Sequence, residues 1–144
     1  MALFMPAWFI GLLPLRYSFD KTIALHDPQH INMSSAEDQP ILCQRCQTVI
    51  TTRAAAIELA GQHAHQLTNP AGVTYEVVLY REANCQVQGP PTPEYTWFAG
   101  FTWQIALCGH CAAHLGWLYT KPESLGFYGL IKSQLMFGKS GKIK

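Results

Sequence analysis

The amino-acid sequence predicts a small all-β domain, and three features indicate this fold class. Residues 73–81 (VTYEVVLYR) form the clearest strand, because β-branched and aromatic side chains dominate the run. Shorter runs of similar character, at residues 116–119 and 126–131, are bounded by turn-forming glycine, proline and serine. The chain has 144 residues, of which 49% are hydrophobic, so it can bury one core but is too short for two.

The other elements are taken in chain order. Residues 41–50 (ILCQRCQTVI) are expected to form two short strands around a tight turn. Residues 51–67 contain good helix formers and are a candidate helix, although a glycine interrupts them. Residues 82–93 contain three prolines and are expected to form a loop. Residues 95–107 are expected to give two short aromatic strands on either side of Ala99-Gly100.

Four of the five cysteines form two Cys-x-x-Cys pairs, which is the spacing of a structural zinc site with the ligands Cys43, Cys46, Cys108 and Cys111. Each pair supplies two thiolates from one turn, and two such turns complete a tetrahedron. Residues 47–107 lie between the pairs, so the metal closes a long loop. The metal-free chain is therefore expected to fold poorly.

Other interpretations of these side chains are weaker. Two disulfides, or cysteines packed as small apolar groups, are the alternatives to a metal. A redox role would need a thioredoxin-like setting, which this sequence does not offer. Cys85 is unpaired and is expected to be a free thiol. Three histidines near these segments, His63, His65 and His114, are interpreted as structural because no complete ligand set surrounds them.

A cluster of aromatic residues follows residue 95. Trp97, Trp103 and Trp117 fall within 21 residues, and Tyr119 shares a strand face with Trp117 because it lies two positions later. Aromatic stripes on strands usually belong to a core. However, a domain of this size has difficulty burying three indoles, and each indole N–H needs a partner. A core and a small-ligand cage therefore both fit the pattern.

The net charge and the N-terminal residues disfavour some partners and locations of the protein. The formal net charge is +1 and only 13% of residues are charged, which argues against a nucleic-acid partner.

The apolar run at residues 1–15 is too short for a membrane span. The first positive charge of the chain comes after this run, whereas in a secretory signal it comes before the apolar segment. We expect a cytoplasmic protein with a poorly defined segment at residues 1–39, a domain at 40–138 and a polar tail at 139–144. Met33 is an alternative translation start.

Several segments together resemble the cereblon-like, thalidomide-binding CULT domain family, and most closely its single-domain bacterial members. The segments are ILCQRC, HQLTNPAG, EYTWFAGFTWQIALCGHCAAHLGWLY and FYGLIKSQL. The resemblance covers roughly residues 40–138. It implies a β-tent, in which two antiparallel sheets meet at a large angle and a zinc on both cysteine pairs pins them.

The resemblance also implies a ligand site. In that family an aromatic cage binds glutarimide and related cyclic imides, including uracil-like rings and cyclised imide termini of proteins. The implied ligand-binding residues here are Asn69, Pro70, Tyr95, Trp97, Trp103, Trp117 and Tyr119. Animal members have histidine in place of Tyr95 and phenylalanine in place of Tyr119. The region that docks animal members onto a ubiquitin ligase has no counterpart in this sequence, so a substrate-receptor role is not implied.

Two other functions compete with this non-enzymatic binding module. B-type methionine sulfoxide reductases also have two Cys-x-x-Cys pairs and a His-Leu-Gly segment, but they need a nucleophilic cysteine near the C-terminal strand. No cysteine follows Cys111 here. A zinc-ribbon adaptor for nucleic acid or protein is the third possibility, in which exposed tryptophans would stack on bases.

Overall fold

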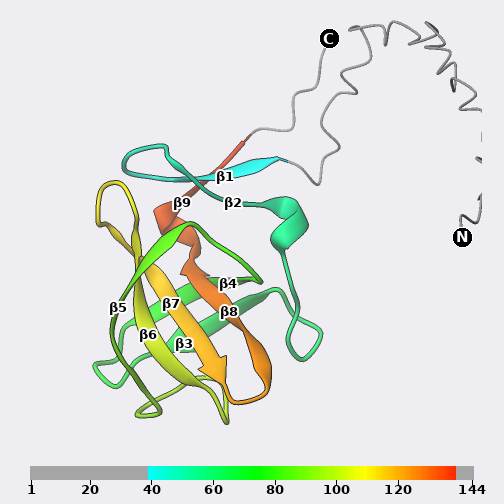
Figure 1. Cartoon of the computed structure of the whole chain (residues 1–144), viewed down its shortest axis with the longest axis vertical. Helices are drawn as coiled ribbons and strands as arrows, with labels where there is room; N and C mark the ends of the chain where they lie inside the picture. Colours follow the sequence, from blue (N-terminus) through cyan, green and yellow to red (C-terminus); the bar gives the residue numbers. More distant parts are fainter. Residues whose placement is uncertain (1–38, 139–144) are drawn as a thin grey trace, which may run out of the picture. The chain divides into compact units, whose positions relative to one another are not determined.

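A computed structural model describes residues 39–138, and in this range the chain forms two antiparallel sheets (Figure 1). The smaller sheet has the strand order β2-β1-β9 and the larger sheet the order β3-β4-β8-β7-β6-β5. The predicted fold class, all-β with two antiparallel sheets, is confirmed. The expected N-terminal segment at residues 1–39, except residue 39, the expected tail at residues 139–144 and the Met33 hypothesis lie outside the described residues.

The smaller sheet joins two distant parts of the chain. Its strands are β1 (Pro40–Cys43), β2 (Val49–Thr52) and β9 (Leu135–Phe137). Strand β1 is central and pairs with both neighbours. As the sequence predicts, a tight turn joins β1 to β2; Cys43 is the last residue of β1 and Cys46 lies in the turn.

The larger sheet carries the other strands. These are β3 (Ala64–Thr68), β4 (Thr74–Tyr80), β5 (Cys85–Thr92), β6 (Thr102–Cys108), β7 (His114–Lys121) and β8 (Ser124–Ile131). Two short 3-10 turns, Arg53–Ala55 and Lys132–Gln134, complete the secondary structure of the described range. Within that range, no helix is long and apolar enough to cross a membrane.

The candidate helix at residues 51–67 is wrong. Strand β2 continues to Thr52, a 3-10 turn follows, and β3 begins at Ala64. Positive φ angles at Ala60 and Gly61 reverse the chain between them, which no α-helix tolerates. The pairing of β3 with β4 overrides the local helix propensity of this alanine-rich segment.

Two other boundaries also differ from the sequence expectations. Residues 82–93 are not a loop, because Cys85–Thr92 forms the edge strand β5. Prolines are tolerated there because one side of an edge strand needs no backbone donors. Residues 95–107 form one strand rather than two, since the chain turns through residues 95–100 and β6 starts only at Thr102.

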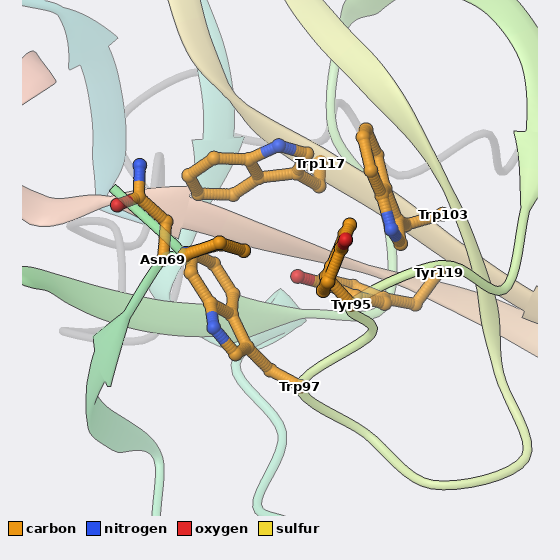
Figure 2. Close-up of a pocket in the computed structure, with 7 residues that line it drawn as sticks. Asn69, Tyr95, Trp97, Trp103, Trp117 and Tyr119 are labelled. Carbon is orange, nitrogen blue, oxygen red and sulfur yellow. The ribbon is translucent and has the colours of Figure 1, made fainter. Parts of the chain in front are cut away.

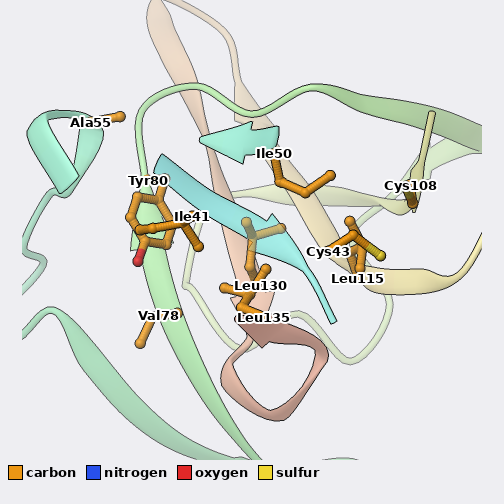
Figure 3. Packing of buried hydrophobic residues seen from close by; sticks show 10 residues of the cluster. All are labelled: Ile41, Cys43, Ile50, Ala55, Val78, Tyr80, Cys108, Leu115, Leu130 and Leu135. Atoms are coloured by element: carbon orange, nitrogen blue, oxygen red, sulfur yellow. The ribbon is translucent and has the colours of Figure 1, made fainter. Parts of the chain in front are cut away.

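Both faces of the larger sheet are buried, and β4 shows why. Val78 and Tyr80 pack with residues of the smaller sheet in one cluster, which Figure 3 shows. Val77 and Leu79 point to the opposite face and belong to a second cluster with the aromatic residues. The zinc-side core and the aromatic cluster therefore share a single layer of strands.

A β-bulge in β7 determines which side chains of this strand point to each of the two faces. Ala106 pairs with Gly116, but Leu107 pairs with His114, so Leu115 is an extra residue opposite β6. Regular alternation would place Leu115 on the same face as Trp117 and Tyr119. The bulge instead places Leu115 in the zinc-side core and leaves the two aromatic residues in the other cluster.

Gly116 makes this bulge possible, and we expect Gly116→Ala to destabilise the domain by about 1–3 kcal/mol or more. Its φ of +153° lies in a region that residues with a side chain rarely adopt, and an added Cβ would lie 2.1 Å from the Gly129 carbonyl oxygen. Chemical denaturation of both proteins measures the effect. Gly72→Ala is a control that keeps a positive-φ strain but has no steric contact. Equal losses in the two variants would contradict the steric argument.

Candidate metal centre and aromatic pocket

Two matching turns present the cysteine sulfurs. In the first, the Gln47 N–H donates to the Cys43 carbonyl and the Cys43 N–H donates to the Thr48 carbonyl. In the second, the Ala112 N–H donates to the Cys108 carbonyl and the Cys108 N–H donates to the Ala113 carbonyl. The residue after the second cysteine has a positive φ in each turn, 61° at Gln47 and 58° at Ala112. The two Cys-x-x-Cys segments thus adopt the same conformation.

The four sulfurs lie close enough to hold one metal ion. The Cys43 and Cys111 sulfurs are 3.7 Å apart, and the Cys46 and Cys108 sulfurs are 3.5 Å apart. All four lie within 4.8 Å of one another. A tetrahedral zinc with Zn–S bonds of about 2.3 Å requires sulfurs about 3.8 Å apart, so the observed cluster fits zinc. The predicted cofactor is confirmed, and it is structural because four thiolates leave no open position.

The protein favours ionisation at one of these cysteines. Hydrogen bonds from the Thr48 side chain and backbone lower the pKa of Cys46 to about 6, against the smaller opposing effect of burial. At Cys111 the hydrogen bond from the Ala113 backbone lowers the pKa, but burial and the neighbouring cysteines outweigh it and raise the pKa to about 11. Without a cation, the cluster therefore cannot hold four negative charges at neutral pH. Zinc binding must release protons.

The fifth cysteine is next to this site but is not part of it. Cys85 pairs with Cys108 across β5 and β6, yet the ligand cluster contains only the other four cysteines. Burial, with smaller contributions from Cys108 and Cys43, raises the pKa of the Cys85 thiol to about 12. It is therefore a neutral thiol at physiological pH.

The three histidines interact with backbone and do not join the cluster. His63 Nδ1 lies 2.9 Å from the Ile57 carbonyl and His65 Nε2 lies 3.0 Å from the Gln62 carbonyl. Both rings thus fasten the loop before β3. His114 Nε2 lies 3.0 Å from the Gly116 carbonyl, and its ring packs edge-on against Trp117. These contacts agree with the structural interpretation of all three side chains.

On the other face of the larger sheet, a cavity of about 230 Å³ brings together all seven residues that the resemblance implies for a ligand site. Figure 2 shows three indoles arranged around this cavity. Its lining comprises Asn69, Pro70, Tyr95, Trp97, Trp103, Trp117 and Tyr119. Trp97 packs edge-on against Trp117, with the ring centroids 4.9 Å apart.

Two of the indole N–H groups are used within the protein. Trp97 Nε1 donates to the Thr68 carbonyl at 2.9 Å, and Trp103 Nε1 donates to the Glu94 carbonyl at 2.8 Å. These bonds tie the walls to the β3 end and to the loop before residue 95. The two rings therefore present apolar faces to the cavity, because their N–H groups are already hydrogen-bonded to backbone carbonyls.

The rim offers unused backbone groups. Within residues 39–138, no hydrogen bond uses the backbone N–H or C=O of Tyr95 or Trp97. Tyr95 is 76% exposed and has a φ of 55°, a conformation that is uncommon for a residue with a side chain. On the other side of the cavity, Asn69 Oδ1 accepts the Val73 N–H and fixes the turn at Asn69, Pro70, Ala71 and Gly72.

Two further residues support the walls, and no motif in the sequence indicates them. Tyr75 packs against both Trp97 and Trp117, and Phe98 packs edge-on against Tyr119 and Phe127. Tyr75 could have been found from β4, because it shares a face with Val77 and Leu79. Phe98 lies in a turn, where no periodic pattern indicates its direction.

The metal and the cavity are linked by two strands. Strand β6 carries Trp103 and ends at Cys108, and β7 follows Cys111 and carries Trp117 and Tyr119. The second cysteine turn therefore connects the two strands that supply most of the aromatic wall.

Several known proteins are similar to this chain. A family described as Yippee zinc-binding/DNA-binding/Mis18, centromere assembly, matches residues 40–138. Cereblon of Gallus gallus is 35% identical over 104 residues, which cover 67% of this chain and 23% of that protein. Cereblon of Xenopus tropicalis is 35% identical over 105 residues, 66% of this chain and 23% of the relative. Cereblon of Danio rerio is 32% identical over 104 residues, which cover 67% of this chain and 24% of that protein. The matched region thus spans about a quarter of these relatives.

Proposed function

This chain belongs to the Yippee-Mis18 family, its described part is a cereblon-like domain, and we propose that it binds cyclic imides in the pocket of three tryptophans. It would act as a non-enzymatic binding module in which the zinc holds the scaffold. Its partner would be a small cyclic imide, or a protein that carries one as a cyclised terminus. The proposal concerns imide binding by this domain alone.

The observation that carries the proposal is the combination of apolar walls with free backbone groups at one edge. An imide has an N–H between two carbonyls on one side of its ring and methylenes on the other. The unused N–H and C=O groups of Tyr95 and Trp97 suit the polar side, and the indole faces suit the methylenes. The cavity of about 230 Å³ is below the roughly 300–1,000 Å³ of drug-sized pockets, so it favours a compact ring.

Titration with glutarimide tests the proposal. We expect a change in tryptophan fluorescence and a saturable heat by calorimetry, because the ring would contact the indoles directly. N-Methylglutarimide is the matched control, since the methyl group removes the imide donor and adds bulk at the polar edge. Binding should then weaken by about tenfold or more. No heat with glutarimide or uracil, or equal binding of the methylated ring, would contradict the proposal.

The reductase alternative is disfavoured by the one cysteine outside the zinc cluster. A nucleophilic cysteine must reach the thiolate form, but burial raises the pKa of Cys85 to about 12. Trp117 also stands where the reductase has a histidine after Leu-Gly. Incubation with free methionine sulfoxide and a thiol reductant discriminates the two functions, because turnover that depends on Cys85 would establish the enzyme.

The description of the matched family includes DNA binding, so a nucleic-acid role needs its own test. The formal net charge of +1 provides little attraction for a phosphate backbone. We expect no binding of short oligonucleotides in low salt. Salt-sensitive binding that glutarimide does not displace would favour the adaptor function.

A further inference from the structure

Tyr119 carries a polar group that the fold itself does not use. The residue is 1% exposed and lines the cavity, and no hydrogen bond within residues 39–138 involves its hydroxyl, which is open to the cavity because it is not among the buried polar atoms that lack a partner. Figure 2 shows the hydroxyl between the three indoles. Its ring stacks on Phe127 and packs edge-on against Phe98, so these two ring contacts are apolar.

Tyr119 lies deeper in the cavity than the rim residue Tyr95. Tyr95 is 76% exposed at the mouth, whereas Tyr119 is buried at the floor. The indole N–H groups of Trp97 and Trp103 already bond to carbonyl oxygens, so neither can serve the Tyr119 hydroxyl. Burial raises the pKa of Tyr119, which keeps the hydroxyl neutral and able both to donate and to accept.

We propose that the Tyr119 hydroxyl hydrogen-bonds to the bound ring at an atom outside the imide edge, and so selects rings with a polar atom there. This inference rests on the proposed function, because it assumes that the imide edge meets the rim. A ring that fills the cavity with methylenes alone excludes water and leaves the buried hydroxyl unpaired, which is unfavourable. A ring with an N–H or carbonyl at that position satisfies it.

A matched pair of ligands isolates this contact. Dihydrouracil has the imide edge and ring size of glutarimide, but an N–H replaces one methylene next to a carbonyl. Desolvating the extra N–H disfavours dihydrouracil unless the protein provides a partner. We therefore expect dihydrouracil to bind the unchanged protein at least as tightly as glutarimide. If the unchanged protein binds dihydrouracil more than tenfold more weakly than glutarimide, the inference is contradicted. This test needs no variant.

The variant Tyr119→Phe tests the hydroxyl directly, because the aromatic ring and its packing remain. We expect the ratio of dihydrouracil affinity to glutarimide affinity to fall about tenfold, with a weaker dihydrouracil complex and an equal or tighter glutarimide complex. Calorimetry on both proteins with both rings measures this ratio. Zinc content and thermal unfolding establish that the variant is folded.

The outcomes separate the two proposals. If neither ring binds the unchanged protein, the proposed function itself fails. If both rings bind and the ratio is the same in the variant, imide binding stands but Tyr119 does not select the ring. Tyr80→Phe is a matched control outside the cavity, and its ratio should stay within about threefold of the unchanged protein because Tyr80 packs in the zinc-side core on the opposite face of the larger sheet.

Discussion

Replacing Cys108 with serine is expected to unfold the domain and to abolish imide binding at the same time. Cys108 is 1% exposed, lies at the end of β6, and contributes one of four clustered sulfurs. Zinc binding at structural sites has an apparent free energy of about 10–16 kcal/mol at neutral pH. Domains of this size are stable by only about 5–15 kcal/mol. Losing most of the metal affinity therefore removes an amount comparable with the whole stability.

The neighbouring Cys85 provides a matched control. It pairs with Cys108 across the strands and is partly buried, but it is not a ligand. Cys85→Ser should keep full zinc content and lose at most about 1–3 kcal/mol, since a hydroxyl replaces a buried thiol. Metal analysis, near-UV circular dichroism and thermal unfolding compare the variants. A folded Cys108→Ser protein without zinc would show that the two sheets do not need the metal.

A strong chelator applied to the unchanged protein addresses the same point without a substitution. The expected result is loss of tertiary structure, with recovery on adding zinc. Acid should act in the same direction, because metal binding requires thiolates and the pKa of Cys46 is about 6. Below that value the Cys46 thiolate is protonated as well as the Cys111 thiol, so zinc binding weakens more steeply with falling pH than it does near neutrality.

The metal ligands and the aromatic side chains could be identified from the sequence because each signal is local. A Cys-x-x-Cys turn needs only four residues, and the shared face of Trp117 and Tyr119 follows from strand alternation. Leu115 shows the limit of such reasoning. Alternation places it with Trp117, but the bulge opposite Ala106 and Leu107 moves it to the other core. A bulge is set by pairing between strands, which periodicity along one strand does not contain.

Long-range pairing also explains the wrong secondary-structure expectations. Residues 82–93 contain prolines that normally disfavour a strand, and only the edge position of β5 makes them acceptable. The contacts that support the walls of the cavity could not be predicted from the sequence for the same reason. Tyr75 reaches Trp97 and Trp117 only after β4, β7 and the turn before β6 come together.

Replacing Trp103 with alanine is expected to weaken glutarimide binding by about 30-fold or more and to remove most of the fluorescence response. The indole forms one wall of the cavity, so its loss removes a large apolar contact. Its Nε1 also bonds to the Glu94 carbonyl, which precedes the rim residue Tyr95. The substitution thus opens the wall and releases the loop that presents the backbone groups of the polar edge.

Trp103→Phe separates these two contributions. Phenylalanine keeps an aromatic face in the cavity but has no N–H, so only the bond to Glu94 is lost. If the wall dominates, this variant should bind within about fivefold of the unchanged protein; if the loop anchor dominates, it should resemble the alanine variant. Both variants should retain zinc, because the four sulfurs lie on the far side of the larger sheet from the aromatic cluster. Unchanged glutarimide affinity in zinc-loaded Trp103→Ala would place imide binding outside this cavity, since no ligand enclosed by the three indoles could lose one of them without effect.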